Sequence, residues 1–379
     1  MTRYSASQKG ILKNLTYASV GVNRTQRSET RLKISKALRH QKSVFGSPIE
    51  LPFGLIFPST NPEEFFDLEI EGIGTKTLLA EYLPGAYNSI GIDGVAMAVN
   101  DVIRSGSKPI LLTDAIHIAR SDPRIVKSII NGVLEGAVRS GCPLASGETG
   151  DVPEVFHLDL HHAKSQPFDL IVSCLGLVQT ERIVQGKIKE GDAVIGIESS
   201  GIHSNGVSLA RRILLKQWGG KFGPYEAPDG FSRTVAMELL EPTRIYVKEI
   251  LEAGKRFKLK AAIHITGDGF AKFQRILDFQ GRAKHFGFEF DFQSPLPRIF
   301  DLIERTAASL RLAVSKREMF QTFNMGFGFA VIVEPEIAED VVDLFNKYHP
   351  AKAIGRVTTS GRIKIYGPKT WDRPVILER

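Results

Sequence analysis

The residues best suited to chemistry lie in one stretch of the chain, residues 70–101. An apolar run there ends in a turn, residues 71–76, that reads Glu-Gly-Ile-Gly-Thr-Lys. The two glycines allow tight backbone geometry and the close approach of a ligand. A hydroxyl group and a cation follow directly, and such groups hold phosphate, although the glycine spacing is not that of a Walker A loop. The turn therefore predicts a phosphate-binding loop built on Gly72, Gly74, Thr75 and Lys76.

Acidic and amide side chains continue this stretch on a predicted helix. After Pro84–Gly85, apolar residues recur at the i, i+3, i+4, i+7 spacing of an amphipathic helix. Asp93, Asn100 and Asp101 form another stripe of that helix, and a carboxylate followed two turns later by an Asn-Asp pair is unusual on a buried helix. The alternative is structural: Asp93 is then a first-turn acid favoured by the helix dipole, and the other two are surface residues.

Three later turns have a similar character. An acid in a glycine-flanked turn, such as Glu148, suits a metal or phosphate ligand, but a plain turn explains it as well. A serine- and glycine-rich turn at a helix N-terminus offers free N–H groups to an anion, and His203 and Asn205 add side-chain donors there. A buried structural role is the alternative for His203. The turns are 147–151 after a strand at 142–146, 199–206 before a helix from Val207, and 264–269 after a strand at 260–265.

Composition and cysteine content limit the class of protein. The 379 residues predict two domains with substantial cores. The 42% hydrophobic and 24% charged content is that of a globular protein, and no apolar run is long enough to span a membrane. The first residues lack the apolar core of a signal peptide. Cys142 and Cys174 lie in apolar contexts, so we expect buried free thiols and a cytoplasmic location.

Positive charge is concentrated at the start of the chain. The net charge is +7, but residues 1–42 hold ten Lys and Arg and a single acid, Glu29, which gives this arm +9 and the remainder −2. A basic arm can bind nucleic acid, cover a polyanionic small ligand, or form a solvated leader. Few aromatic residues interleave with the charges, which argues against a platform that stacks the bases of single-stranded nucleic acid.

Alternating strand and helix patterns fill the rest of the chain and predict an α+β fold. A linker at 179–189 separates an N-terminal domain, 1–182 with a basic arm at 1–45, from a C-terminal domain, 183–379. Residues 157–162 read His-Leu-Asp-Leu-His-His, which is either a transition-metal site on one face of a strand or a polar exposed strand. Strands are predicted at 50–57, 65–70, 109–119, 142–146, 168–178, 192–198, 260–265, 286–292, 327–333, 353–357 and 362–366, and helices at 28–40, from 92, 123–138, from 207, 241–253, after 269 and 335–348.

Seven motifs follow one another along nearly the whole chain. They are EGIGTK (71–76), GIDGVAMAVND (91–101), SGCPLASGET (140–149), SSGIHSNG (199–206), PTRIYVK (242–248), HITGDGF (264–270) and TFNMGFG (322–328). In this order they resemble the phosphoribosylformylglycinamidine cyclo-ligase family, also called the AIR synthase family. The fifth and seventh motifs favour this family over its relatives.

The resemblance implies two α/β-type domains, with the N-terminal domain forming a β-barrel between the subunits of a homodimer. It also implies a reaction of purine biosynthesis in which ATP activates the formyl amide oxygen of formylglycinamidine ribonucleotide. A nitrogen of the same substrate then closes the ring to give aminoimidazole ribonucleotide, ADP and phosphate. Holding the substrate folded would supply much of the acceleration. Mg²⁺ is the implied cofactor, and K⁺ is possible in this family.

Residue roles follow from matching positions. His203, Asn205 and Lys76 are expected at the reacting centre, with His203 stabilising an oxyanion or moving a proton. Lys33, or else Lys36, resembles a family lysine that reaches ATP. The expected ATP- and phosphate-binding residues are Lys33, Gly72, Gly74, Thr75, Lys76, Asp93, Asn100, Gly147, Glu148 and Thr149; the expected substrate-binding residues are Ser204, Gly206, Thr266, Gly267, Thr322 and Asn324; the expected metal ligands are Glu71, Asp93 and Glu148.

Three positions depart from the family pattern. Glu71 replaces the usual Asp, Asp268 interrupts a run of three glycines near a presumed phosphate pocket, and the glycine-rich segment at 45–54 is reduced. A paralogue that uses ATP on another amide or phosphate acceptor is therefore the main alternative. A nucleotide- or nucleic-acid-binding protein is a further one.

Overall fold

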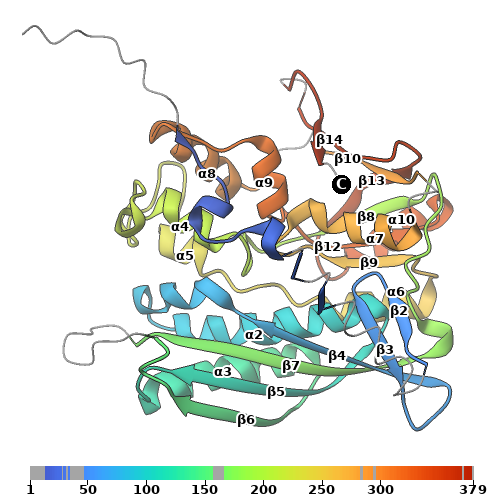
Figure 1. Cartoon of the computed structure of the whole chain (residues 1–379), viewed down its shortest axis with the longest axis horizontal. Coiled ribbons are helices and arrows are strands. Elements are labelled where there is room, and N and C mark those ends of the chain that lie inside the picture. The colour runs from blue at the N-terminus through green and yellow to red at the C-terminus, as the bar shows by residue number, and fades with distance from the viewer. Residues whose placement is uncertain are drawn as a thin grey trace, which may run out of the picture.

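The computed structural model describes residues 13–27, 29–30, 33–34, 47–156, 166–281, 285–292, 296–368 and 371–377. In Figure 1 two sheet-and-helix units lie one above the other, with the N-terminal unit below and the C-terminal unit above. Of the helices in the described part of the chain, none is long and apolar enough to cross a membrane.

The N-terminal unit is a six-stranded sheet in the order β2-β3-β4-β7-β5-β6. Only the pair β5 and β6 among its pairings is parallel. The strands are β2 (Ile49–Leu51), β3 (Gly54–Pro58), β4 (Glu64–Gly72), β5 (Lys108–Ile118), β6 (Leu144–Asp151) and β7 (Phe168–Gln179).

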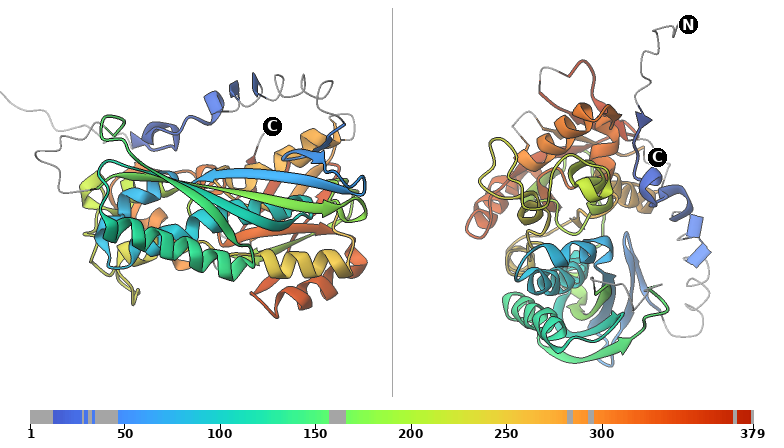
Figure 2. Two further views of the ribbon diagram at one scale, coloured as in Figure 1. Left: turned by 90° about the horizontal axis from the view of Figure 1, so that it is seen from below. Right: turned by 90° about the vertical axis from the view of Figure 1, so that its left-hand side faces the viewer.

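Helices α2 (Ala86–Val102) and α3 (Pro123–Ser140) cover one face of this sheet, as Figures 1 and 2 show. The two helices approach closely at glycines. A Cβ at Gly91 would lie 2.2 Å from the Ile129 carbonyl oxygen, and a Cβ at Gly132 would lie 1.9 Å from that of Asn88. Glycine is required at both positions for this packing.

Helix α3 (Pro123–Ser140) confirms the helix predicted at 123–138 and has favoured residues at both ends. The Asp122 side chain caps the helix by accepting a hydrogen bond from the Arg124 N–H at 2.9 Å, and Pro123 occupies the first turn. Gly141 stops the helix in the left-handed region with φ of 68°. These are the favoured residues at the two ends of a helix.

The second face of the sheet is not covered by the described chain. On β4, Asp67, Glu69 and Glu71 alternate with three apolar side chains that point the other way. These three side chains are exposed by 37%, 69% and 65% and form an apolar stripe on this face of the sheet. They are Phe66, Leu68 and Ile70.

The C-terminal unit is a seven-stranded sheet in the order β15-β14-β10-β13-β8-β12-β9. Every residue of β12 is buried, which makes it the centre of this core. The strands are β8 (Ala193–Glu198), β9 (Ala261–His264), β10 (Gly287–Asp291), β12 (Phe327–Val333), β13 (Ala351–Thr358), β14 (Ile363–Tyr366) and β15 (Val375–Leu377). The helices are α4 (Val207–Leu214), α5 (Val235–Leu239), α6 (Val247–Arg256), α7 (Gln274–Gln280), α8 (Arg298–Ser309), α9 (Lys316–Thr322) and α10 (Ala338–Phe345).

The N-terminal arm lies on the C-terminal unit. Its short strand β1 (Lys13–Asn14) pairs in parallel with β11 (Leu312–Ala313). Figure 2 shows this dark blue segment running along one side of the molecule. The two cysteines are buried and free, as predicted.

Several predicted elements were wrong in detail. The single strand at 50–57 is a hairpin of β2 and β3, and the helix from 241 begins only at Val247. The helix at 335–348 is shorter, since a 3-10 turn at Pro335–Ile337 precedes α10. The predicted metal motif at His157, Asp159 and His161 lies outside the described residues, as does most of the helix predicted at 28–40.

The predicted turn at 147–151 is part of β6. Gly147 pairs with Asp114 of β5, and a Cβ at Gly147 would lie 2.5 Å from the Asp114 carboxylate. Glycine at this position therefore leaves room for the Asp114 side chain of the paired strand. In the sequence, the same glycine resembles a turn signal.

Candidate active site

Three of the predicted motif turns meet at one cleft between the two units. The cleft has a volume of about 390 Å³. The N-terminal unit contributes the turn after β4, and the C-terminal unit contributes the turns before α4 and after β9. The predicted site residues that line the cleft are Glu71, Gly72, Gly74, Thr75, Ser204, Asn205, Thr266 and Gly267.

Lys76 and Asp93 do not line this cleft but form a buried pair beside it. Lys76 Nζ lies 2.7 Å from Asp93 Oδ2, and neither side chain has exposed surface. Lys76 also donates to the Glu241 carbonyl oxygen at 2.8 Å. The backbone N–H and hydroxyl group of Thr243 donate to Asp93 Oδ1 at 2.7 and 2.6 Å. The pair therefore joins the N-terminal unit to the loop before α6 through its contacts with Glu241 and Thr243.

Asp93 lies in the middle of α2, since the helix begins at Ala86. The interpretation of Asp93 as a first-turn helix acid is therefore wrong. Asn100 makes a similar connection two turns later, because its side chain donates to the Arg244 carbonyl oxygen at 2.8 Å and accepts from the Tyr246 N–H at 2.9 Å. The packing of the C-terminal unit against α2 thus explains the polar stripe of this helix.

The loop at 199–206 presents Asn205 to the cleft and keeps His203 beneath it. His203 is fully buried, and its Nε2 accepts a hydrogen bond from the Ser200 N–H at 3.2 Å. Burial, with help from the nearby His264 and Lys76, holds the pKa of His203 well below its usual range, so the ring is neutral. The Asn205 side-chain Nδ2 is buried and has no hydrogen-bond acceptor among the described residues. An amide donor without a partner at the wall of a cleft is available to a ligand.

Asn324 is a buried support of the same loop, and Thr322 is buried two residues before it. Asn324 donates to the Gly201 carbonyl oxygen at 2.9 Å and accepts from the Ser199 hydroxyl group at 3.1 Å. Thr322 donates to Glu318 at 3.1 Å. Neither side chain is exposed or lines the cleft. The φ of 71° at Gly206 lets the chain turn from this loop into α4.

The floor of the cleft is a cluster of buried charges. Asp101 Oδ1 lies 2.7 Å from His264 Nδ1, and its Oδ2 lies 3.1 Å from the Arg104 guanidinium. Burial alone would raise the pKa of Asp101, but Arg104, Lys272 and His264 together hold it well below its usual range. Arg104 also pairs with Glu69 at 2.7 Å. Asp101 is therefore an anion with several fixed donors.

Glu71 and Lys272 have perturbed pKa values at this floor. Burial and the neighbouring charge of Asp101, to which Glu71 is hydrogen-bonded, raise the pKa of Glu71 to about 8. Burial lowers the pKa of Lys272 to about 8, and its Nζ donates to the Thr266 hydroxyl group at 2.7 Å. Groups whose pKa values approach neutrality in a cleft are candidates for proton transfer.

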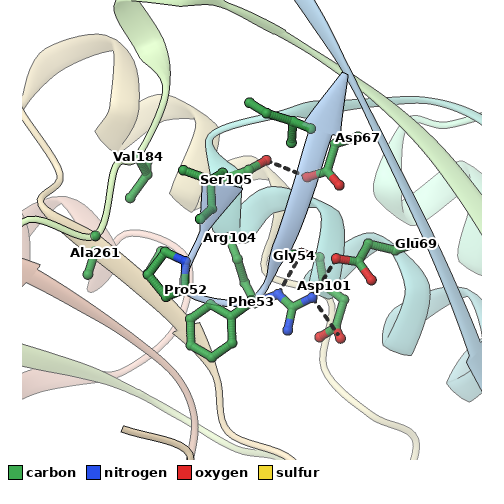
Figure 3. A pocket seen from close by; sticks show the side chains of 14 residues that line it. Pro52, Phe53, Gly54, Asp67, Glu69, Asp101, Arg104, Ser105, Val184 and Ala261 are labelled. Carbon is green, nitrogen blue, oxygen red and sulfur yellow. Dashed lines mark hydrogen bonds and ion pairs between the residues drawn. The ribbon is translucent and has the colours of Figure 1, made fainter. Parts of the chain in front are cut away.

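Figure 3 shows the continuation of this cluster under the β2–β3 hairpin. Arg104 points between Glu69 and Asp101, and the Phe53 ring lies 4.9 Å from its guanidinium carbon. Lys272 and Arg275 also lie within 6 Å of the same ring, at 5.8 and 5.7 Å. One aromatic side chain of the hairpin therefore contacts three cations, which cation–π attraction favours.

The structure does not bring the remaining predicted residues to the cleft of this chain. Gly147, Glu148 and Thr149 lie on the exposed edge strand β6. Lys33 is exposed on the arm and does not line the cleft, and Lys36 lies outside the described residues. Within the described ranges, no three His, Cys, Asp or Glu side chains are arranged to hold a metal ion.

The sequence interpretation missed several residues of the cleft wall. Tyr17, Arg27, Phe53, Lys272 and Arg275 all line it. They come from the arm, the hairpin and the segment after β9, far apart in sequence. No local pattern marks them, since each is a common residue type in an ordinary context.

Comparison with known proteins agrees with this architecture. Two family models match, one described as the N-terminal domain of AIR synthase related protein over residues 58–178 and one as its C-terminal domain over residues 189–368. The chain is thus built as a two-domain protein of the AIR synthase related class. Among solved structures, hydrogenase maturation protein HypE in complex with ATP aligns with a TM-score of 0.56 at 16% identity, covering 90% of this chain and 95% of that one. Thiamine-monophosphate kinase from Stenotrophomonas maltophilia aligns with a TM-score of 0.56 at 15% identity, covering 82% and 88%. These likenesses show the fold.

Curated relatives narrow the class to one family. The phosphoribosylformylglycinamidine cyclo-ligase of Pyrococcus furiosus is 35% identical over 363 residues, which cover 94% of this chain and 99% of the relative. That of Methanocaldococcus jannaschii is 36% identical over 380 residues, covering 96% and 100%. The chain belongs to the phosphoribosylformylglycinamidine cyclo-ligase family, which confirms the resemblance seen in its motifs.

Proposed function

We propose that the chain catalyses the ATP-dependent closure of the imidazole ring of aminoimidazole ribonucleotide from formylglycinamidine ribonucleotide, in purine biosynthesis. The observation that carries this proposal is the meeting of three family motifs at one cleft of about 390 Å³ in a chain that aligns end to end with named cyclo-ligases. The products are ADP, phosphate and the cyclised ribonucleotide. A cytoplasmic location accompanies this proposal.

Asn205 is the proposed electrophilic donor. Asn205 lines the cleft, and its side-chain N–H group has no acceptor among the described residues, so it can donate to the formyl oxygen as negative charge develops there. His203 keeps a positioning role in this proposal, because its neutral ring accepts from Ser200 and fixes the loop that carries Asn205. Ser204, Gly206, Thr266 and Gly267 would bind the ribonucleotide around this donor.

Lys272 is the proposed proton carrier. Ring closure releases a proton from the attacking nitrogen, and the cleft must accept it. The pKa of Lys272, lowered to about 8, and its place in the cleft wall let it exchange a proton close to neutrality. Asp101 stays ionised beside Lys272 and stabilises its cationic form.

ATP with Mg²⁺ is the proposed phosphoryl donor. Mg²⁺ is usually held by one or two carboxylates together with the phosphates of its ligand. Glu71 and Asp101 fit this role, since a divalent cation would replace the proton that they now share. When bound, the ion would neutralise charge on the transferred phosphoryl group. The glycine turn with Gly72, Gly74 and Thr75 would face the phosphates, and K⁺ is a further candidate ion.

A homodimer through the uncovered face of the N-terminal sheet completes the proposal. Phe66, Leu68 and Ile70 expose a contiguous apolar surface of the kind that marks protein contacts. Pairing this face with a second copy would form the intersubunit β-barrel expected for the family.

Gly147, Glu148 and Thr149 lie on the edge of the same sheet, so the dimer would bring them towards the partner's cleft, where Glu148 would join the metal–nucleotide site. We place the domain boundary at residues 182 and 183.

A coupled turnover assay tests the function. The protein would be mixed with ATP, Mg²⁺ and formylglycinamidine ribonucleotide, and ADP and aminoimidazole ribonucleotide would be measured together. Equal formation of the two is expected, with none when ATP or the ribonucleotide is left out. ADP formation without the cyclised product would contradict the proposal and point to another acceptor for the phosphoryl group.

A further inference from the structure

The N-terminal arm forms a wall of the cleft. Its composition left open a nucleic-acid-binding arm, a cover over a polyanionic small ligand or a solvated leader. Tyr17, Val22 and Arg27 line the cleft opposite the turn after β4 and the two turns of the C-terminal unit. The Tyr17 hydroxyl group meets the backbone of Gly206 at the start of α4, and burial raises its pKa. Residues 13–27 therefore complete the cleft rather than lie apart from it.

The arm is anchored to the C-terminal unit by specific contacts. The Tyr17 N–H donates to Glu318 Oε1 at 2.8 Å, and Leu15 donates to the Ala313 carbonyl oxygen at 3.0 Å. Arg24 pairs with the same Glu318 carboxylate at 3.0 Å and donates to the Gln321 carbonyl oxygen at 2.9 Å. Its guanidinium also lies 5.1 Å from the centre of the Tyr17 ring. These contacts fix the position of the helical turn at 24–27.

Arg27 lies three residues after Arg24 on this turn but makes no such contact. It is exposed, and no hydrogen-bond acceptor or carboxylate contacts its guanidinium among the residues that the structure describes. The other cations of the cleft wall are engaged: Arg104 pairs with Glu69 and Asp101, Lys272 donates to Thr266, and Arg275 lies 4.0 Å from Asp268. Arg27 is thus a cation at the cleft with five donors to offer.

We propose that Arg27 binds the phosphate group of the ribonucleotide substrate and so makes the arm part of the substrate site. Phosphate fits because guanidinium donates two parallel hydrogen bonds to its oxygens. The substrate is favoured over ATP because the arm is anchored on the C-terminal unit, close to the turns at Ser204–Asn205 and Thr266–Gly267. This inference rests on the proposed function, since that function supplies the ribonucleotide.

The test compares Arg27→Gln, Arg27→Lys and the charge-matched control Arg362→Gln in steady-state kinetics. Arg362 is exposed at the turn before β14 and does not line the cleft. Arg27→Gln is expected to raise KM for the ribonucleotide about tenfold, the lower end of what a charged hydrogen bond contributes, and to leave kcat and KM for ATP within about twofold. Arg27→Lys should recover part of the loss, and Arg362→Gln should match the wild type.

Several outcomes would overturn the proposal. These are an unchanged KM for the ribonucleotide in Arg27→Gln, a rise in KM for ATP instead, or an equal rise in Arg362→Gln. Calorimetric titration with formylglycinamidine ribonucleotide distinguishes a failure of the Arg27 proposal from a failure of the proposed function. If the wild type binds the ribonucleotide without turning it over, about tenfold weaker binding by Arg27→Gln still supports the site, and equal binding overturns it. If the wild type neither binds nor turns over the ribonucleotide, both proposals fall.

Discussion

The buried pair of Lys76 and Asp93 is expected to hold the two units together, and replacing Lys76 with methionine tests this. In Lys76→Met, the Asp93 carboxylate keeps its two hydrogen bonds from Thr243 but loses the counter-charge at 2.7 Å, where neither side chain has exposed surface. Removing one partner of a buried ion pair costs about 3–5 kcal/mol, because the remaining charge stays buried and unpaired. We therefore expect the free energy of unfolding to fall by about 4 kcal/mol.

Urea denaturation measures this loss. With a denaturant dependence of about 3 kcal/mol per molar, a loss of about 4 kcal/mol moves the midpoint down by about 1.3 M. Lys316→Met is the matched control, since Lys316 pairs with Glu304 at a similar 2.6 Å but is 44% exposed. An exposed pair contributes about 0–1 kcal/mol. The double variant Lys76→Met, Asp93→Asn should recover part of the loss, because no charge is then left unpaired.

One result would refute this reasoning. If Lys76→Met unfolds at the same urea concentration as the wild type but loses ATP turnover, then the Lys76 ammonium group reaches the ligand, and its role is catalytic as the motif suggested. Loss of stability in the single variant, with recovery in the double variant, would support the structural role.

Three further predictions concern the cleft and the sheet. Asn205→Ala should lower kcat about 100-fold, as loss of a single oxyanion donor does, and a change of less than about threefold would remove Asn205 from the reacting centre. Folding raises the pKa of Glu71 to about 8 from an unfolded value of about 4.3. The stability that this shift contributes is therefore fully present below about pH 4.3 and is lost as the pH rises through about 8. Glu71→Gln should therefore show a melting temperature that falls less between about pH 5 and pH 8, and an unchanged slope would contradict the raised pKa. Leu68→Asp combined with Ile70→Asp should turn the proposed dimer into a monomer in sedimentation experiments, whereas a monomeric wild type would refute the interface.

The family and the order of its elements could be predicted from the sequence because both depend on local signals. The helix predicted at 123–138 matches α3, which has favoured end residues at Asp122, Pro123 and Gly141, and the strand predicted at 168–178 matches β7. The glycine turn at 71–76 and the loop at 199–206 were found from residue type and spacing, and both reach the cleft. Seven motifs in the family's order indicated the family, and the relatives confirm it.

The roles of single polar residues could not be predicted in the same way. Asp93 and Asn100 have the residue types of ligand-binding groups, yet in the fold they bond to Thr243, Arg244 and Tyr246. Whether a buried polar group meets a ligand or a distant backbone depends on packing between elements more than 140 residues apart in sequence. Such contacts leave no local pattern.

The sequence by itself determined the two domains, most strands and helices, and the family, because periodicity, capping and motif order act over a few residues at a time. Only the tertiary structure decided which side chains face the cleft. It buried His203 and Lys76, presented Asn205, joined Glu71 to Asp101, and laid Tyr17 and Arg27 of the arm against the loops of the second unit. The physical reason is that exposure and charge pairing depend on neighbours brought together by folding, whereas helix and strand formation depend mainly on neighbours along the chain.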